Sequence, residues 1–471
     1  MRLDDLLTAI EISEWRGDRS VEITSVVQDA SDVREGSLFC CVVGARADGH
    51  DFAAQAVSRG ATAVLCERFL DLPERVAQLR VPDVRAAVGP AASAAYGHPS
   101  RSMTVVGITG TNGKTTTAHL LASVLRADGR DTGVIGTLWG IGGPPTTPDA
   151  SALQARFEEL RSSGTEAVVM EVSSHALHQH RVDGTRFACA VFTGLTQDHL
   201  DYHHTLEEYF EAKALLFRPE LSERGVVNAD DPHGRVLLER GGIPLTPYSM
   251  SDGGDVSVGA VSSEFDWRGE RVRLPLGGHF NVANAIAAAT VAELLGVEAP
   301  AVARGLASAG PVRGRFEPVE GGQPFSVIVD YAHTPDGLEQ LLEACRRSAE
   351  GARVLVVFGC GGDKDKAKRP LMGAIAARLA DLAIVTSDNP RSEDPHAIID
   401  EVVAGAPDAG LLIEADRREA IALAFRNAAP GDIVVIAGKG HETTQVIGER
   451  EIPFDDRSVA LDLLRDGRPR T

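Results

Sequence analysis

The sequence predicts an α/β protein built on parallel sheets, and three observations lead to that prediction. The chain has 471 residues, enough for about three domains of ordinary size. From residue 102 onward, β-branched apolar runs alternate with segments of helical spacing. The alternation starts afresh at residue 311. This second series indicates a further doubly wound domain of about 160 residues.

The expected elements follow the chain in order. Residues 1–100 are mixed, with a strand at ATAVLC. The run SMTVVGIT then enters a glycine-rich turn that is followed by a helix, TTTAHLLASVLRADG. Further strands of this region are expected at EAVVMEV, CAVFTGL and GVVNADD, and one amphipathic helix over 207–217. The last region has expected strands at FSVIVD, RVLVVFG, LAIVTS and DIVVIAG, separated by helices such as DGLEQLLEACRRSAE and DRREAIALAFRNAA.

Bulk composition excludes several classes of protein. The chain is 43% hydrophobic and 24% charged, as in globular proteins, and its net charge of −20 argues against nucleic acid as a partner. Its first residues carry acids where a secretion signal needs bases, and no apolar run reaches about 18 residues, so we expect no membrane span. Six cysteines without a C-x-x-C pair indicate free thiols and a cytoplasmic protein.

The stretch GITGTNGKTTT, residues 107–117, has the layout of a phosphate-binding loop. Backbone N–H groups of such a turn point at phosphate oxygens, and the dipole of the following helix adds to them. Lys114 could reach the β- and γ-phosphates, and Thr115 could place its hydroxyl on Mg²⁺. The strict motif would need glycine where this chain has Ile108, so the loop is a variant. The alternative is a structural glycine-rich turn.

Two polar segments follow the next expected strands. Glu171 stands at a strand end, where ligand contacts gather in open α/β sheets, and its carboxylate could hold Mg²⁺. The segment TQDHLDYHH contains His199. Its clustered His and Asp residues suggest zinc, but no thiolate lies near and no zinc spacing is present. An ordinary strand-end acid and a structural histidine are the alternatives.

Four polar segments of the last region each follow an expected strand: DYAHTPDGL, VFGCGGDKDKAKRPLMG, TSDNPRSEDP and AGKGHE. Residues at strand carboxyl ends converge on one crevice. Lys364, Arg391 and Glu442 would supply both signs of charge there, which suits a zwitterionic ligand such as an amino acid. The alternative is that these are polar turns.

Lys213 is unusual because only six of the 47 basic residues are lysines. It lies within the helix expected over 207–217. A surface lysine near Glu207 and Glu208 is the simple explanation. An amine, unlike a guanidinium, can be uncharged and act as a nucleophile, so the position could also be chemical.

With these motifs in order, the chain resembles the Mur ligases of peptidoglycan synthesis. The resemblance covers nearly the whole chain. Its motifs are GTNGKTT, TTPDA, MEVSSHAL-x-QHRV, DHLDYH, EAK, NADDP, GHFNVANA, GRFE, DYAHTPDGL, FGCGGDKD-x-x-KRP, DNPRSEDP and GKGHE. Within the family it is similar to the MurE branch, the ligases that add the third residue of the peptide.

The resemblance implies a three-domain α/β fold. Residues 1–100 would be a mixed α/β domain for UDP-MurNAc, residues 101–310 a central ATP-binding domain with a mainly parallel sheet, and residues 311–471 a Rossmann-like amino-acid domain. It also implies an ATP-dependent amide ligase that adds meso-diaminopimelate to UDP-MurNAc-L-Ala-D-Glu through an acyl phosphate. Mg²⁺ is the implied cofactor, together with a CO₂-derived carbamate on Lys213, and a monomer is expected.

The resemblance assigns site residues by motif. Those implied in catalysis are Lys114, Glu171, His199 and Lys213, and those implied as metal ligands are Thr115, Glu171, His199 and Lys213 as its carbamate. The residues implied around ATP are Gly110, Thr111, Asn112, Gly113, Lys114, Thr115, Thr116, Asn281, Arg315 and Asp330. Those implied for the UDP-sugar dipeptide are Thr146, Thr147, Ser173, Gln179 and Arg181. Those implied for the amino acid are Lys364, Asp388, Asn389, Pro390, Arg391, Gly438 and Glu442. The arginine of DNPR would grip the distal carboxylate of meso-diaminopimelate.

Three departures from the family pattern bear on the substrates. The family's D-S-R reads Asp29-Ala30-Ser31, the arginine of GCGGDRD is Lys364, and T-N-L-S-R-D-H begins Thr193-Gly194 and has Gln197 for its arginine. These departures leave two other enzymes open: a ligase for L-lysine or another amino acid, and a folylpolyglutamate-type or lipid-linked muramoyl ligase. An ATP-binding switch without catalysis is the alternative of another class.

Overall fold

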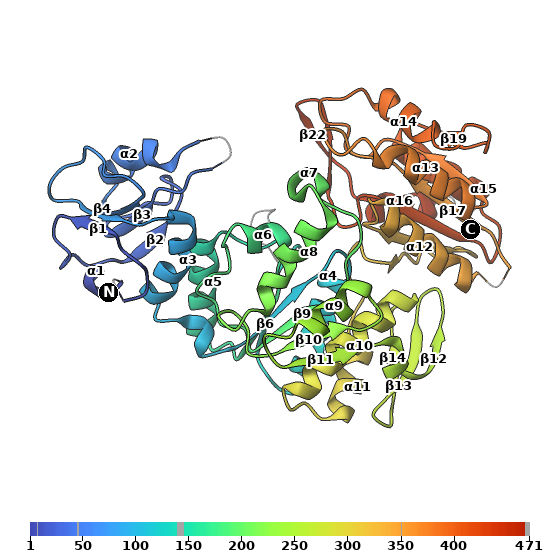
Figure 1. The fold of residues 1–471 in the computed structure, drawn as a ribbon. Helices are drawn as coiled ribbons and strands as arrows, with labels where there is room; N and C mark the ends of the chain where they lie inside the picture. Colours follow the sequence, from blue (N-terminus) through green and yellow to red (C-terminus); the bar gives the residue numbers. More distant parts are fainter. Residues whose placement is uncertain (7, 45–46, 139–145, 350, 467–471) are drawn as a thin grey trace. The chain divides into compact units, whose positions relative to one another are not determined.

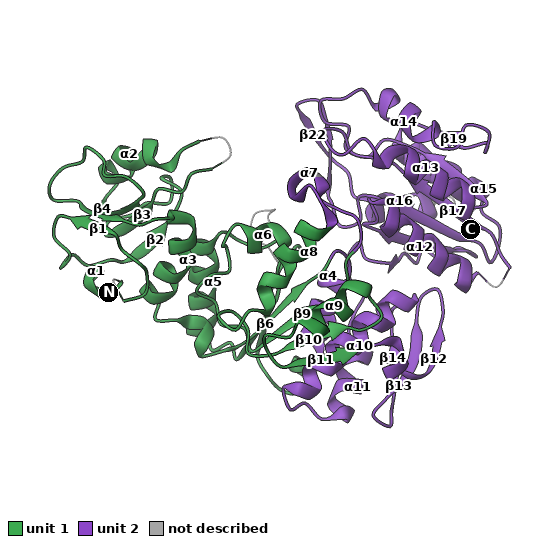
Figure 2. Cartoon of the chain, in the orientation of Figure 1, with its two compact units in different colours: residues 1–110, 125–195, 207–248 green, residues 111–124, 196–206, 249–471 purple. Residues whose placement is uncertain are grey.

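The computed structural model describes residues 1–6, 8–44, 47–138, 146–349 and 351–466, and Figure 1 labels their elements. The chain divides into two compact units, coloured in Figure 2. Unit 1 comprises residues 1–110, 125–195 and 207–248, and unit 2 comprises residues 111–124, 196–206 and 249–471. The domain boundaries expected at residues 100 and 310 stay a prediction.

The first sheet of unit 1 has five strands in the order β1-β5-β4-β3-β2. All neighbours pair in parallel except β1, which runs antiparallel to β5. Alternate residues of β3 and β4 pack against α3 on one face and α2 on the other. The elements are α1 Leu3–Leu6, β1 Glu14–Arg16, β2 Ser25–Val27, β3 Ser37–Cys40, α2 Ala53–Ser58, β4 Ala61–Cys66, β5 Ala77–Arg80 and α3 Val84–Ala95, with 3₁₀ turns at Gly49–Phe52 and Pro99–Arg101.

The second sheet of unit 1 has six strands, all parallel, in the order β11-β10-β9-β6-β8-β7. Strands β8 and β9 are buried at every residue, which explains why they form continuous apolar runs in the sequence. The parallel sheet predicted for this region is therefore confirmed. The elements are β6 Thr104–Thr109, β7 Thr132–Ile135, α5 Ala150–Ser162, β8 Ala167–Glu171, α6 Ser174–His178, β9 Cys189–Phe192, α8 Leu206–Ala214, a 3₁₀ turn Leu215–Phe217, β10 Gly225–Asn228, α9 Pro232–Arg240 and β11 Leu245–Tyr248.

Asp231 joins two segments at the carboxyl edge of this sheet. Its Oδ1 accepts from the backbone N–H groups of His233 and Gly234, which caps α9, and its Oδ2 accepts from Leu195 N at 2.9 Å. We expect Asp231→Ala to lower the free energy of unfolding by about 1 to 3 kcal/mol, because a helix cap and a loop contact are lost together. Urea denaturation measures this. Asp230→Ala is the control, because Asp230 is the exposed neighbour of Asp231. A loss of unfolding free energy of equal size in Asp230→Ala would contradict the capping argument.

The main sheet of unit 2 has six strands in the order β15-β16-β20-β17-β18-β19. All but β15 run parallel, so the second doubly wound sheet predicted from residue 311 is confirmed. The elements are β15 Glu317–Pro318, β16 Ser326–Asp330, α12 Pro335–Ser348, β17 Val354–Phe358, α13 Lys368–Leu379, β18 Leu382–Val385, α14 Pro395–Val403, β19 Leu412–Ile413, α15 Arg417–Asn427, β20 Ile433–Ala437 and α16 Asp456–Asp466.

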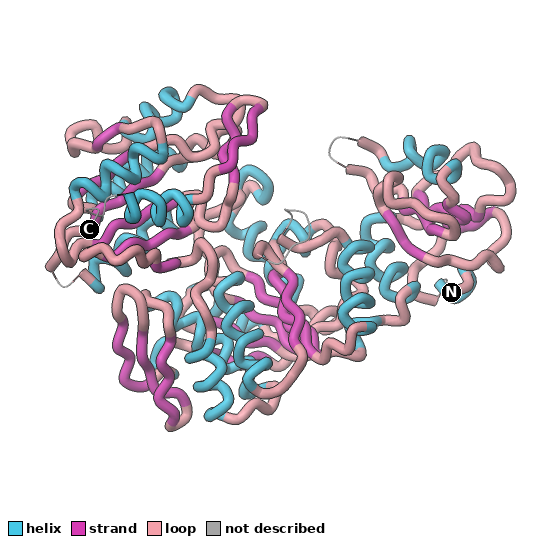
Figure 3. The backbone as a smooth tube through the Cα atoms, turned by 180° about the vertical axis from the view of Figure 1, so that it is seen from behind, coloured by secondary structure: helices cyan, strands magenta, loops and turns pink. Residues whose placement is uncertain are grey.

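Helices cover both faces of this sheet, as the tube view in Figure 3 shows. In β17, Val354, Val356 and Phe358 pack with α12, α13 and α14, whereas Leu355 and Val357 pack with α15 and α16. Because side chains alternate along a strand, a sheet buried on both faces needs apolar residues at every position. The carboxyl ends of the strands are left for polar loops.

Unit 2 also contains elements that were not predicted. A three-stranded antiparallel sheet joins β12, β13 and β14, and a two-stranded sheet joins β21 and β22. Helix α4 begins in unit 2 and ends in unit 1. The remaining elements are α4 Lys114–Ala127, α7 Leu200–His203, a 3₁₀ turn Met250–Asp252, β12 Gly254–Val258, β13 Ser263–Trp267, β14 Glu270–Leu274, α10 His279–Leu294, α11 Ala299–Ser308, β21 Thr444–Ile447 and β22 Arg450–Pro453.

All six cysteines are buried free thiols, as the sequence led us to expect. Burial raises the pKa of Cys66 to about 11 and that of Cys189 to about 12. None of the helices described here has both the length and the apolar character needed to cross a membrane.

Candidate active site

The phosphate loop has the predicted strand, turn and helix. Strand β6 ends at Thr109, Gly110 and Gly113 have φ of +149° and +85°, and α4 begins at Lys114. Positive φ at both glycines lets the backbone curl so that N–H groups can line a concave turn. Within unit 2, Thr115 and Thr116 are buried, and Lys114 Nζ folds back to donate to Thr111 O at 2.8 Å.

Lys213 is buried beside the start of this loop, within unit 1. The residue is 1% exposed, its Nζ donates to Gly110 O at 2.9 Å, and it lies 4.2 Å from the centroid of the Tyr209 ring. The simple explanation of a surface lysine is therefore wrong. The predicted helix over 207–217 is α8, which gives way to a 3₁₀ turn after Ala214.

Glu171 is also buried in unit 1, at the carboxyl end of β8. Its Oε1 accepts from Thr137 N at 2.8 Å, and Thr137 Oγ1 donates to Oε2 at 3.4 Å. The carboxylate packs against Gly136, where an added Cβ would lie 2.4 Å from Oε1. An ordinary strand-end acid would be exposed, so this burial favours a functional carboxylate.

Gly136→Ala should therefore displace the Glu171 carboxylate without unfolding the sheet. We expect kcat of the ATP-dependent ligation predicted from the sequence to fall about 100-fold, because a shift near 1 Å in a site group has an effect of that size. Steady-state kinetics and the melting temperature measure the two effects. Gly310→Ala is the control, since no atom lies within 4 Å of a Cβ there. Unchanged kcat in Gly136→Ala would show that the exact place of this carboxylate is unimportant.

The residues predicted for the UDP-sugar dipeptide lie together in unit 1. Thr147 Oγ1 donates to Glu171 O at 3.0 Å and accepts from Ser173 N at 3.1 Å. Arg181 donates to Thr147 O at 3.1 Å and to Gln179 Oε1 at 2.9 Å. The fifth residue, Thr146, shares a hydroxyl–hydroxyl bond of 3.1 Å with Thr137. These bonds connect the five predicted residues to the Glu171 strand end.

A cavity of about 470 Å³ in unit 1 lies beside the altered D-S-R motif. Its lining includes Asp29, Ser31, Arg34, Tyr96 and Asp149. Asp29 Oδ1 accepts from both the N–H and the hydroxyl of Ser31, each at 2.7 Å. Ser31 therefore closes a local turn on Asp29.

A second cavity, of about 440 Å³, lies within unit 2. Six of the seven residues predicted for the amino acid line it, and Pro390 does not. His199 lines it as well. The structure thus brings the four C-terminal polar segments together as predicted. The six lining residues are Lys364, Asp388, Asn389, Arg391, Gly438 and Glu442.

Charged groups at the wall of this cavity shift the pKa values of their neighbours. Burial pushes the pKa of Asp198 up, but the charges of His199 and Lys114 and the hydrogen bond from the His199 backbone N–H outweigh it, so the pKa lies below its usual value. Burial lowers the pKa of His333, and the Lys368 ammonium lowers it further. Asp198 is therefore a carboxylate, and His333 is neutral, at neutral pH. The predicted metal ligand His199 faces the cavity beside a negative charge.

The residues predicted near the nucleotide in unit 2 have unused polar atoms. Asn281 Nδ2 donates to Gly277 O at 2.7 Å, but its buried Oδ1 accepts no hydrogen bond from the described residues. Arg315 Nε is likewise buried without a described partner, and the guanidinium lies over the Tyr331 ring. Such atoms fit a ligand with donors and acceptors of its own. Asp330 instead holds two turns, accepting from Phe316 N and Ala332 N, and burial raises its pKa.

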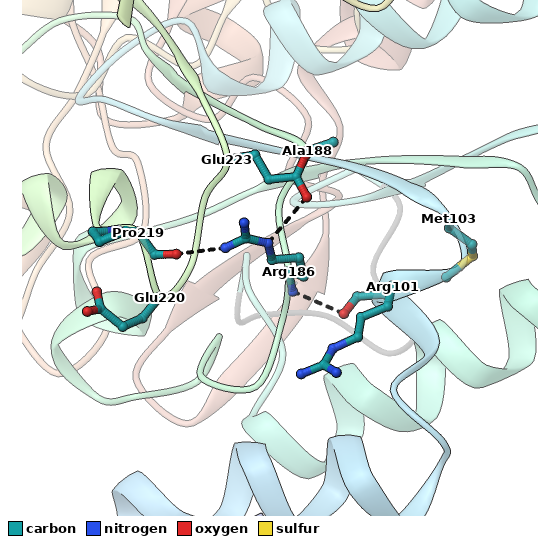
Figure 4. Close-up of a pocket in the computed structure, with 8 residues that line it drawn as sticks. Arg101, Met103, Arg186, Ala188, Pro219, Glu220 and Glu223 are labelled. Carbon is teal, nitrogen blue, oxygen red and sulfur yellow. Dashed lines mark hydrogen bonds and ion pairs between the residues drawn. The ribbon is translucent and has the colours of Figure 1, made fainter. Parts of the chain in front are cut away.

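A further cavity of unit 1, about 500 Å³, lies at the amino ends of β6, β9 and β10 (Figure 4). The Arg186 guanidinium in this cavity already donates hydrogen bonds to Pro219 O at 2.7 Å and to Glu223 Oε1 at 3.3 Å. Ligands of open α/β sheets bind at the carboxyl ends of the strands, so we assign this cavity no role.

Comparison with known families shows to which family the chain belongs. The chain matches the Mur ligase middle domain over residues 108–292, the glutamate ligase domain of Mur ligases over 314–440, and the domain described as Mur ligase family, catalytic domain, over 22–96. The chain belongs to the Mur ligase family.

Relatives of this Mur ligase share its full length. One from Gloeobacter violaceus is 46% identical over 100% of this chain and 99% of its own, and one from Syntrophomonas wolfei is 43% identical over 99% of both chains. Both are named UDP-N-acetylmuramoyl-L-alanyl-D-glutamate–2,6-diaminopimelate ligase. A solved structure of a ligase with that name has a TM-score of 0.70 at 32% identity and covers 99% of both chains. The three-domain α/β fold class is thereby confirmed.

Several residues that contact or line these candidate sites were not predicted. Gly136 and Thr137 contact Glu171, Asp336 accepts from Asn112 Nδ2 at 3.1 Å, and Lys368 lines the unit 2 cavity. Asp336 and Lys368 stand in motifs that the resemblance already contained, so the motifs could have identified them. Gly136 carries the weaker signal of a glycine at a strand end. Among the described residues, no group of three His, Cys, Asp or Glu side chains is placed to hold a metal.

Proposed function

We propose that this Mur ligase adds meso-diaminopimelate to UDP-MurNAc-L-Ala-D-Glu with hydrolysis of ATP, in the cytoplasmic synthesis of peptidoglycan precursors. The observation that carries the proposal is the unit 2 cavity, which is lined by the basic residues Lys364 and Arg391 and by the acids Asp388 and Glu442. A ligand with two ammonium and two carboxylate groups matches such a wall in charge. The buried free thiols agree with a reducing compartment.

In this proposal ATP lies on the phosphate loop. The N–H groups of residues 110–116 bind its phosphates, and Lys114 swings from Thr111 O to the β- and γ-phosphates. Asn281 and Arg315 supply the unused polar atoms for the rest of the nucleotide. Thr115 and His199 of unit 2, and Glu171 and modified Lys213 of unit 1, offer ligand types that Mg²⁺ accepts, and by the family resemblance these residues would hold it. Bound there, Mg²⁺ would supply charge stabilisation to the transferring phosphoryl group.

The reaction has two steps. The terminal carboxylate of the UDP-sugar dipeptide attacks the γ-phosphorus of ATP, ADP leaves, and an acyl phosphate forms. The uncharged amine of the amino acid then attacks the acyl carbon, inorganic phosphate leaves, and the amine proton passes to a base. Thr146, Thr147, Ser173, Gln179 and Arg181 orient the dipeptide. The carboxylate of Asp198, which lines the cavity, would accept the proton.

Lys213 acts in this scheme as a carbamate. Its uncharged amine attacks CO₂, one N–C bond forms and one proton is released. The product is a carboxylate on a long arm. Its place beside Gly110 O, at the start of the phosphate loop, supports the proposal. A buried ammonium is costly, so conversion to a ligand of a cation removes an unfavourable charge.

The remaining parts of the proposal concern domains and acceptor recognition. Residues 1–100 bind the UDP-sugar through the cavity beside Asp29, residues 101–310 bind ATP, and residues 311–471 bind the amino acid. Arg34 lines that first cavity, so a guanidinium is present there although the family's D-S-R arginine is not. Lys364 keeps the charge of the family arginine without its two-donor fork. We propose that the enzyme acts as a monomer.

The test is phosphate release by the purified enzyme with ATP, Mg²⁺ and UDP-MurNAc-L-Ala-D-Glu, and with a panel of amino acids. We expect release with meso-diaminopimelate and little with L-lysine, because L-lysine lacks the distal carboxylate. Release with L-lysine alone would refute the substrate. Calorimetry that detects ATP but no UDP-sugar dipeptide would indicate another acceptor, and nucleotide binding without product would indicate a switch.

A further inference from the structure

Lys439 is a fully buried lysine for which the proposed reaction has no use. It follows β20 between Gly438 and Gly440, and its exposed fraction is 0%. An ammonium has three N–H donors and no acceptor. All three find acceptors, which are Glu442 Oε2 at 3.0 Å, Asn389 Oδ1 at 3.2 Å and Thr444 O at 2.6 Å. The ammonium is thus a three-way joint between two segments that line the amino-acid cavity.

This joint fixes the amide of Asn389. Lys439 Nζ and Val446 N, at 3.2 and 3.0 Å, can only donate, so the atom between them must be the amide oxygen. The amide nitrogen Nδ2 then donates to Glu442 Oε2 at 2.7 Å. Neither side chain can turn over without breaking a charge-assisted bond. Asn389 is 5% exposed, so such a break would leave a buried polar group unpaired.

Two polar groups are left over at the cavity wall. Glu442 Oε2 receives both Lys439 and Asn389, whereas Oε1 accepts no hydrogen bond from the part of the chain that the structure describes. Asn389 Nδ2 uses one of its two N–H donors on Glu442. One acceptor with negative charge and one donor therefore remain, side by side. An ammonium and a carboxylate on one carbon atom match that pair.

We propose that Lys439 is a positioning residue for the incoming amino acid. Its buried ammonium aims Glu442 Oε1 at the ammonium of the amino acid and the free Nδ2–H of Asn389 at the adjacent carboxylate. This inference rests on the proposed function, because it concerns the same cavity. Lys439 itself touches no ligand: it does not line the cavity, and its three donors are used within the protein.

The first test is steady-state kinetics of Lys439→Met with each of the three substrates varied in turn. We expect kcat/KM for meso-diaminopimelate to fall between about 10- and 100-fold, as for the loss of a hydrogen bond to a charged group. The KM values for ATP and for the UDP-sugar dipeptide should stay within about twofold, because neither contacts this joint. Equal losses for all three substrates would overturn the proposal in favour of a general structural role.

The matched control is Arg353→Met. Arg353 pairs with the buried Asp432 at 2.6 Å, at the amino ends of β17 and β20, the opposite edge of the same sheet. This variant should lose stability and keep its KM for the amino acid. If Lys439→Met does not fold, Lys439→Gln replaces it, since an amide can still donate to Glu442 while the charge is gone. The same selective loss is expected.

The second test is a double-mutant cycle with Glu442→Gln. Because Lys439 acts through Glu442 as well as Asn389, the loss in kcat/KM for the amino acid in the double variant should be smaller than the product of the two single losses. Additive losses would overturn the proposal. Wild-type enzyme that turns over no meso-diaminopimelate would refute the proposed function instead. Wild-type turnover with an unaffected Lys439→Met would refute only the role of Lys439.

Discussion

Lys213→Ala should lose ligation by about a thousandfold or more, because charge stabilisation by a bound metal ion is worth several kcal/mol and each 1.4 kcal/mol is tenfold in rate. The residue is 1% exposed and its amine donates to Gly110 O at 2.9 Å, so its loss removes the buried amine that contacts the start of the phosphate loop. Phosphate release at saturating substrates measures the effect. A short carboxylic acid or bicarbonate supplied at high concentration should restore part of the activity if a carboxylate is what is missing.

Lys213→Arg separates the charge of the lysine from its chemistry. Arginine keeps the positive charge, but a guanidinium does not attack CO₂. We therefore expect Lys213→Arg to be as inactive as the alanine variant. Wild-type rates in either variant would exclude the carbamate. If both fold, as judged by their melting temperatures, misfolding does not account for the loss.

A readout independent of activity is ¹³C NMR in labelled bicarbonate. The wild-type enzyme should show one carbamate carbon that both Lys213 variants lack. Lys366→Ala is the control, because Lys366 is exposed and paired with Glu393 at 2.9 Å, and its loss should leave the signal unchanged. The chain has only six lysines, so a signal that survives Lys213→Ala could be assigned to another amine by replacing the other lysines one at a time.

Elements buried on both faces were predictable from the sequence. Strands β8, β17 and β20 are apolar at nearly every position because helices or other strands cover both of their faces. The phosphate loop was predictable because its glycines and the Lys-Thr pair are adjacent in the chain. The convergence of four polar segments on one cavity followed from a general rule of parallel sheets, which place their carboxyl ends together.

The three-stranded sheet β12–β14 was not predicted because little of it is buried. Strand β13 alternates buried and half-buried residues, and β14 has polar residues at three of its five positions. Its turn places Arg268 at φ +49° and Gly269 at +89°, the conformation of a type I′ hairpin turn. Asn-Gly signals such a turn reliably, and Arg-Gly does not.

The contacts that shape the candidate site could not be predicted from the sequence, for a different reason. Gly136 approaches Glu171 from a segment 35 positions earlier, and Lys439 reaches Asn389 across 50 positions. No local pattern encodes such a pair. Lys213 is the clearest example of what the sequence alone cannot predict. An amphipathic helix that carries a lysine is typical of a surface helix. Only the fold shows that Lys213 is buried.

Arg391 is the residue on which the choice of amino acid should depend most. It lines the unit 2 cavity with φ of +51°, a left-handed conformation that arginine adopts at a cost. Its backbone is held there by bonds to Val446 O at 3.0 Å and from Gly448 N at 2.7 Å. One guanidinium nitrogen donates to Gly362 O at 2.7 Å, which leaves most of its five donors for a ligand carboxylate.

Arg391→Asn removes the guanidinium but keeps the backbone, because asparagine tolerates the left-handed region. We expect kcat/KM for meso-diaminopimelate to fall about 30- to 3,000-fold, as when one partner of a buried charge pair worth 2 to 5 kcal/mol is lost. Turnover of L-lysine, which we expect to be slow in the wild type, should change little, since no distal carboxylate is there to bind. The ratio of the two values is therefore the quantity to measure.

Arg268→Asn provides a matched control for that ratio. Arg268 has nearly the same φ, +49°, but is exposed and paired with Glu293 at 3.0 Å on the β13–β14 turn. The same substitution there should leave the ratio unchanged. If Arg391→Asn lowers kcat/KM by the same factor for both amino acids, Arg391 shapes the loop and does not bind the distal carboxylate. A loss with meso-diaminopimelate alone would show that the Arg391 side chain discriminates between the two amino acids. Lys364, the other basic residue predicted to bind the amino acid, carries a point charge and lacks the two-donor geometry of a guanidinium.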